Sequence, residues 1–147
     1  MILKDIYESS NYITDEEMST EQAINSANGA IAEINTRVGT NLPFFIAENY
    51  QEVEYDAFSA SWQLRLLEPY LSFTIATNDS DSDARDFHYN RFNIALAEFR
   101  TNGLDSIKTT YIDEFGNEQE TGYAGNAKRV VKIDATARAN PFSGWWL

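Results

Sequence analysis

The fold is decided by residues 19–39, which read STEQAINSANGAIAEINTRVG. Apolar residues recur here at intervals of three and four, which places them on one stripe of an α-helix: Ile24, Ala27, Ile31, Ile34 and Val38. Ser19 and Gln22 have the spacing of a capping box, and Gly39 is the residue type that ends helices in a left-handed conformation. Four alanines keep this predicted helix slim enough for a second helix to approach closely: Ala23, Ala27, Ala30 and Ala32.

Two further helices are predicted downstream. The second runs from about Glu54 to Thr77, with one apolar face: Phe58, Trp62, Leu66, Tyr70 and Phe73, widened by Leu64, Leu67, Leu71 and Ile75. Pro69 lies inside it, and because proline removes a backbone hydrogen bond we expect a kink near residues 65–68 or two shorter helices. The third runs from about Asp81 to Thr101 and is closed by Asn102-Gly103, with a face of Phe92, Ala95, Leu96 and Phe99.

The segments before and between the helices also carry apolar residues. Residues 1–18 begin with Ile2, Leu3, Ile6 and Tyr7, which predicts a short helix or a packed arm. Pro43 takes the chain out of helical geometry after residue 39. We expect Phe44, Phe45 and Ile46 to enter the core.

From residue 107 the hydrophobic period changes. Residues 108–113 are rich in β-branched and aromatic types, Phe115-Gly116-Asn117 is typical of a turn, and residues 119–123 can return as a second strand, with 129–133 as a further strand. The predicted fold is therefore mainly α, an antiparallel three- to four-helix bundle with a small β-hairpin excursion and an extended C-terminal tail. The predicted parts are a helical body at 1–106, the β excursion at 107–134 and the tail at 135–147.

Composition bounds the function. The 147 residues suit one domain, and the absence of cysteine excludes disulfide frameworks and thiolate zinc sites. No run is long and apolar enough for a membrane span, and no signal-peptide core follows Met1, so we expect no membrane and no export by the usual route. The net charge of −12 argues against binding to nucleic-acid backbones. The charge is uneven, because residues 1–124 carry 7 basic and 22 acidic side chains whereas the C-terminal 23 residues are net basic.

Candidate chemistry is sparse. Asp79, Asp81 and Asp83 match the opening of a calcium loop, but Ala84 stands where the loop needs glycine and Asn90 where it needs glutamate. We interpret these aspartates as a solvated loop at the positive end of the third helix. His88 is the single histidine, with no cysteine or serine elbow to complete a triad, and we expect it to be a packed or surface side chain. We predict no catalytic residues, no cofactor and no metal.

We expect the C-terminal end to bind a partner surface, because large aromatic side chains exposed to water promote aggregation. Its basic and apolar residues are the predicted partner-binding set: Lys128, Arg129, Lys132, Arg138, Phe142, Trp145, Trp146 and Leu147. They can fold back onto their own domain or anchor into another subunit, where Trp and Arg are enriched at hot spots.

The order of these features resembles a known family. A short lead, the acidic residues 14–17, an Ala/Ile helix ending in Thr36-Arg37-Val38-Gly39, two more helices, a β excursion and an extended tail resemble the head-tail connector, or adaptor, proteins of long-tailed bacteriophages. The resemblance covers about residues 13–103 and is most specific at 22–39. It implies a virion protein, assembled in the host cytoplasm, that forms a ring, commonly a dodecamer, beneath the portal.

The resemblance also implies the partners. The C-terminal segment reaches into the portal, the opposite face receives the next neck or tail protein, and DNA passes through the lumen without specific binding. Two other hypotheses remain open from the residues alone. The acidic chain can be a DNA mimic that inhibits a basic nucleic-acid enzyme, or a small enzyme that uses a carboxylate pair.

Overall fold

The computed structural model describes residues 1–10, 12–13, 18–108, 110–112, 115 and 118–120. The chain divides into two compact units, Met1–Gly103 and Leu104–Leu147. The first unit holds the helices and is called the helical unit below. The predicted tail of residues 135–147 lies outside the described residues, and so do all eight predicted partner-binding residues.

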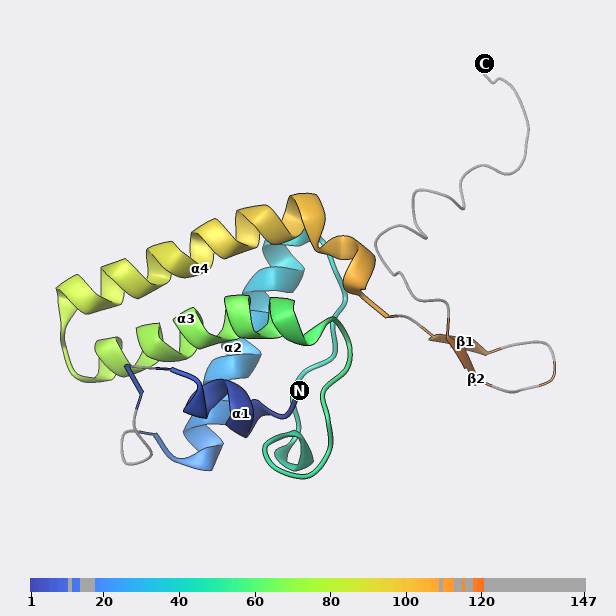
Figure 1. Cartoon of the computed structure of the whole chain (residues 1–147), viewed down its shortest axis with the longest axis horizontal. Helices are drawn as coiled ribbons and strands as arrows, with labels where there is room; N and C mark the ends of the chain where they lie inside the picture. The colour runs from blue at the N-terminus through green and yellow to red at the C-terminus, as the bar shows by residue number, and fades with distance from the viewer. Residues whose placement is uncertain (11, 14–17, 109, 113–114, 116–117, 121–147) are drawn as a thin grey trace, which may run out of the picture. The chain divides into compact units, whose positions relative to one another are not determined.

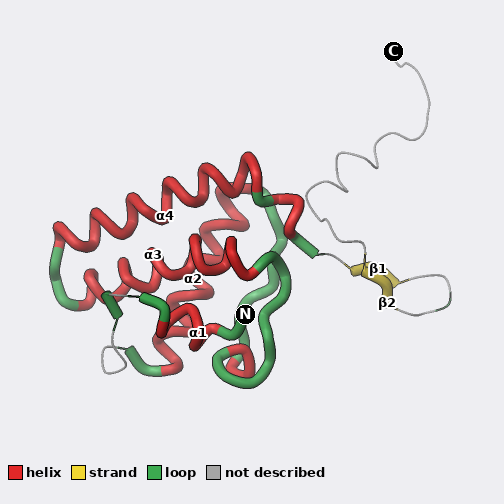
Figure 2. Tube along the Cα trace, in the orientation of Figure 1, coloured by secondary structure: helices red, strands yellow, loops and turns green. Residues whose placement is uncertain are grey.

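The helical unit is built from four α-helices and one 3-10 turn within the described residues (Figure 1): α1 (Leu3–Glu8), α2 (Thr20–Val38), η1 (Ala47–Asn49), α3 (Ala60–Asn78) and α4 (Ser82–Asn102). This confirms the mainly α prediction, and helix dominates the tube view in Figure 2. α3 and α4 run antiparallel side by side, joined by a short connection, whereas α2 crosses behind them (Figure 1). No described helix has the length and apolar character needed to span a membrane.

The predicted caps of α2 are confirmed. The Ser19 hydroxyl accepts from the backbone of Gln22, and the Gln22 side chain accepts from the Ser19 backbone N–H at 2.9 Å. Gly39 ends the helix at φ 85°, a conformation that costs other residues energy. α2 is a well-specified rod because both of its ends are closed by these residues.

The small side chains of α2 do let a second helix approach. Ala23, Ala27 and Ala30 are buried, although Ala32 is exposed. A Cβ on Gly29 would stand 3.2 Å from the Tyr70 hydroxyl of α3, tighter than ordinary contact. The α2–α3 crossing therefore depends on small residues at its centre.

α3 begins at Ala60, so the predicted start near Glu54 is wrong. Ser59 caps the helix by accepting from the backbone of Trp62. The Gln63 side chain turns back and donates to the Tyr55 and Phe58 carbonyls, both at 2.7 Å. These bonds hold residues 55–58 in a non-helical path that buries both aromatic side chains.

α3 is continuous through Pro69, so the alternative of two shorter helices is wrong. Proline has no N–H to donate to the Arg65 carbonyl, which weakens the helix locally. Three leucines close to the proline are buried: Leu66, Leu67 and Leu71. α3 packs more extensively against α4 than against any other described element. Their burial, at about 1.5–3 kcal/mol each, outweighs the loss of one hydrogen bond.

The segment between α2 and α3 corrects another expectation, since Phe45 is buried but Phe44 and Ile46 are exposed. The backbone at Ile46 is extended, and neighbouring side chains of an extended chain point to opposite sides. α2 fixes which side faces inward: the Asn28 side chain accepts from the Phe45 N–H at 2.6 Å and donates to its carbonyl at 3.1 Å. With Phe45 held inward, its two neighbours face solvent.

α4 carries the predicted buried face of Phe92, Ala95, Leu96 and Phe99. Gly103 follows the helix at φ −101°, so its role is not to supply a left-handed conformation. A Cβ there would stand 2.9 Å from Cε2 of the Trp62 ring and would overlap the Phe99 ring, which is nearer still. Glycine is needed at this position for space.

The second unit starts with η2 (Leu104–Ser106). Its described residues include two short strands, β1 (Thr110–Ile112) and β2 (Glu118–Glu120), which pair antiparallel with Tyr111 opposite Gln119. The predicted strand at 129–133 lies outside the described residues, and the wider β excursion stays a prediction.

We predict that Gly103→Ala lowers the free energy of unfolding by about 1–3 kcal/mol, the usual cost of overpacking a filled site. Urea titration measures this directly. The matched control is Asn102→Ala at the neighbouring exposed residue, for which we expect a change within about 0.5 kcal/mol. Equal free energies for the two variants would contradict the steric role of Gly103.

Candidate functional site

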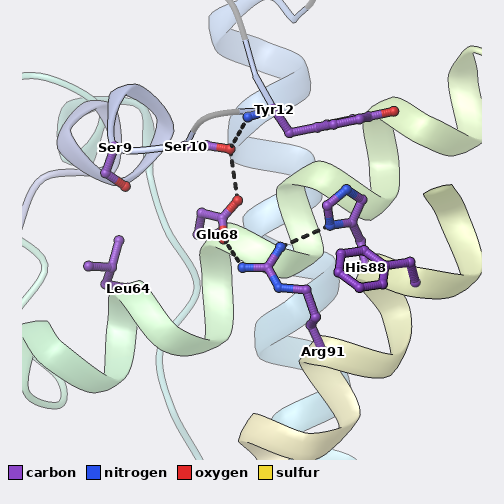
Figure 3. A pocket seen from close by; sticks show the side chains of 8 residues that line it. Ser9, Ser10, Tyr12, Leu64, Glu68, His88 and Arg91 are labelled. Carbon is purple, nitrogen blue, oxygen red and sulfur yellow. Dashed lines mark hydrogen bonds and ion pairs between the residues drawn. The ribbon is translucent and has the colours of Figure 1, made fainter.

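A hollow of the helical unit lies where the segment after α1 meets α3 and α4 (Figure 3). It has a volume of about 400 Å³ and is lined by Ser9, Ser10, Tyr12, Leu64, Glu68, Phe87, His88 and Arg91. His88 and Arg91 are three residues apart on α4 and so face the same side of the helix, toward Glu68 of α3.

Glu68 and Arg91 form the centre of this site. Arg91 Nη2 donates to Glu68 Oε1 at 2.5 Å, and the hydroxyls of Ser10 and Ser72 each donate to Oε2 at 2.8 Å. The Glu68 side chain is 13% exposed and the Arg91 side chain 37%, so the ion pair is partly withdrawn from water. One carboxylate thereby links the segment after α1 to α3 and α4.

The pKa of Glu68 is lower than its ordinary value. Burial raises this pKa, but the hydrogen bonds from Arg91, Ser10 and Ser72 and the charge of Arg91 outweigh burial. Glu68 is therefore ionised at neutral pH and is held by donors on both oxygens.

His88 is packed, which is one of the two predicted alternatives. The residue is 6% exposed, and its ring lies 4.5 Å from the Tyr12 ring and 5.1 Å from the Phe87 ring, centre to centre. Arg91 Nη1 lies 2.9 Å from His88 Nδ1, and because a guanidinium is only a donor, Nδ1 accepts and the ring is neutral. Burial and the Arg91 charge lower the pKa of His88.

The polar side chains at the centre of this site already hydrogen-bond to one another. A carboxylate of low pKa that already accepts three hydrogen bonds is a poor general base and holds no proton to donate. Among the described residues, no group of three or more His, Asp or Glu side chains is placed to hold a metal ion. The cluster's clearest consequence is mechanical, because it ties three segments together around the hollow.

A second carboxylate joins α2 to the other helices. Glu33 accepts from the Tyr70 hydroxyl at 3.1 Å, the Tyr89 hydroxyl at 2.8 Å and Arg37 at 3.4 Å. Burial and the Glu33 charge raise the pKa of Tyr70, and the hydrogen bond to Glu33 together with burial raises that of Tyr89. Both phenols therefore stay protonated donors, and Glu33 connects α2 with α3 and α4.

The aspartate run acts as interpreted from the sequence. Asp81 Oδ1 accepts from the Ala84 N–H at 3.1 Å and caps α4, and Asp83 lies in the first turn. The pairing of Glu68 with Arg91 was not foreseen, since 23 residues separate them and nothing in either local pattern indicates the other.

No protein-family model, curated protein or solved structure matches this chain.

We predict that Glu68→Gln lowers the free energy of unfolding by about 1–3 kcal/mol, because an amide cannot accept from Arg91 and both serines at once. The matched control is Glu98→Gln, which breaks a half-exposed ion pair with Arg65 between the same two helices. That pair should contribute about 0–1 kcal/mol. Equal losses in urea titrations of the two variants would contradict the special role of Glu68.

We also predict that the free energy of unfolding decreases as pH falls from about 7.5 to about 5.5. The pKa of His88 is lower in the folded chain than in the unfolded chain, so the unfolded chain binds more protons in this window. His88→Asn keeps an acceptor near Nδ1 but does not titrate, and its free energy should stay level. A parallel decrease in the variant would contradict this assignment, because the chain has a single histidine.

Proposed function

We propose that this chain is a structural virion protein, a head-tail connector (adaptor) that forms a ring below the portal, joins the capsid to the neck or tail and lets DNA pass. The observation that carries the proposal is the geometry of α2. Residues 22–39, where the resemblance is most specific, form a doubly capped rod with a small-residue face that crosses α3. The further helices α3 and α4 follow in the expected order.

The surface of the helical unit supports an assembly role. Several large apolar side chains are about half exposed or more on a strongly acidic chain, among them Phe44, Phe87 and Ile94. Clustered exposed apolar side chains mark sites of protein contact. In this proposal the chain acts by binding and not by catalysis.

The acidic charge suits a channel for DNA. Attraction of each phosphate to basic side chains would retard a moving polyanion, and like charge discourages such contact. In the proposed ring, commonly of twelve copies, DNA passes through the lumen without specific binding. The assembled ring belongs to the virion neck and receives the next neck or tail protein on the face opposite the portal.

The basic, aromatic C-terminal segment is the proposed portal anchor. It combines four cationic side chains with Phe142, Trp145, Trp146 and Leu147. Tryptophan and arginine are the types most enriched among residues that dominate binding energy. The segment therefore has the chemistry to carry much of the affinity for a portal surface.

A DNA-mimic inhibitor is the second candidate, and one acidic stretch favours it. Glu48, Glu52, Glu54 and Asp56 are all exposed, and residues 38–64 contain no Lys or Arg. A row of carboxylates can imitate phosphates for a basic nucleic-acid enzyme. Such binding would be sensitive to salt and independent of the C-terminal segment.

We predict that the full-length protein forms a stoichiometric complex with the portal ring of the same phage. Deletion of residues 140–147 should weaken the complex at least about 100-fold, because hot-spot tryptophans contribute about 2 kcal/mol or more each. Sedimentation or interferometry measures both affinities. The control Glu48→Gln/Glu52→Gln reduces the acidic stretch and should leave portal binding unchanged.

The same pair of variants separates the two functions. Unchanged portal binding by the truncated protein would contradict the anchor. Binding to a basic nucleic-acid enzyme that is lost in the Glu48→Gln/Glu52→Gln variant but kept in the truncation would favour the DNA mimic.

A further inference from the structure

We propose that this chain associates head to tail with a second copy of itself through two different surfaces of the helical unit. The loop patch consists of Phe44, Ile46 and Val53. The helix patch consists of Phe87 and Ile94 on α4. These are the large apolar side chains that the described part of the helical unit leaves most exposed, between 49% and 62%.

The loop patch is held in place by hydrogen bonds between the Asn49 side chain and the backbone. The Asn49 side chain accepts from the Ile46 N–H at 2.9 Å and donates to the Val53 carbonyl at 3.0 Å, which brings both ends of the patch together. A hollow of about 330 Å³ lies beside Phe44 and Ile46, with Glu54 and Asp56 among its lining residues. The patch is therefore a fixed apolar surface with an acidic border.

The helix patch lies along one side of α4. Phe87 and Ile94 are seven residues apart, which is close to two helical turns, and Arg91 lies between them. A hollow of about 280 Å³ lies beside Ile94 and is lined also by Arg65, Pro69 and Glu98, so that it spans the α3–α4 groove. The two apolar side chains of the helix patch therefore lie beside a hollow and two guanidinium groups.

Charge favours pairing the two patches with each other. Glu54 and Asp56 border the loop patch, so two loop patches would repel each other. Arg65 of α3 and Arg91 of α4 lie beside the helix patch, where they pair with Glu98 and Glu68. A guanidinium has five N–H donors, so each arginine can also bind a carboxylate of a second copy. The acidic border of the loop patch can therefore pair with these arginines.

The two patches lie at different edges of the helical unit. Figure 1 shows α4 along the upper edge and the segment around η1 at the lower right. An interface that joins two different surfaces is heterologous, so each copy contacts two neighbours and the series closes into a ring when the rotation permits. Closure into a portal-sized circle rests on the proposed function, but the pairing of the two patches does not.

Two double variants of the full chain test the pairing: Phe44→Ser/Ile46→Ser in the loop patch and Phe87→Ser/Ile94→Ser in the helix patch. All four side chains are exposed, so both variants should fold, which circular dichroism and urea titration verify. The wild-type protein should form oligomers in sedimentation velocity from micromolar to submillimolar concentration. Each variant alone should be monomeric.

The decisive sample is an equimolar mixture of the two variants. Each variant keeps the patch that the other lacks, so a head-to-tail interface predicts a heterodimer that grows no further. The control Glu21→Ser/Gln51→Ser changes exposed residues outside both patches and should oligomerise as the wild type.

Three results would overturn the pairing: a monomeric wild-type protein, oligomers that persist in either variant, or a mixture that stays monomeric. Portal binding by the variants is measured separately. Oligomers that persist in a variant that still binds portal would overturn the pairing while leaving the portal anchor intact.

Discussion

The antiparallel packing of α3 against α4 is the constraint on which the helical unit depends. Trp62 and Tyr70 of α3 contact Phe99 and Phe92 of α4. The same packing buries the leucines around Pro69, which offsets the hydrogen bond that the proline lacks. The same pairing sets Glu68 opposite Arg91 and Arg65 opposite Glu98. The α3–α4 packing also forms the hollow beside Ile94, so the proposed interface depends on it.

Polar side chains then attach the remaining segments to this pair. Glu68 fixes the segment after α1, Glu33 joins α2 to both helices, and Gln63 shapes the entry into α3. On α2, Asn28 and Asn35 bond to the backbone of Phe45 and Leu42 much as a neighbouring strand would. Each of these bonds orients a segment that apolar packing alone would leave adjustable.

Local patterns predicted the local features well. Capping residues and the three-four spacing placed α2 and α4 almost to the residue, because both signals act within one or two helical turns. The predicted start of α3 is too early because Phe58 also fits the helical face. The Gln63 hydrogen bonds that hold residues 55–58 outside the helix are tertiary contacts that the local pattern does not show. Phe44 and Ile46 were misjudged for a related reason, since composition does not indicate which side of an extended segment α2 will hold inward.

The candidate site was the hardest part to predict, because the Glu68–Arg91 pair joins residues on separate helices. We propose that this acidic helical chain is a ring subunit of a phage neck. Electron microscopy of the purified protein, alone and mixed with the portal ring, tests it most directly. We expect closed rings of this chain stacked coaxially on the portal, and portal rings that remain bare in the presence of excess protein would contradict the proposal.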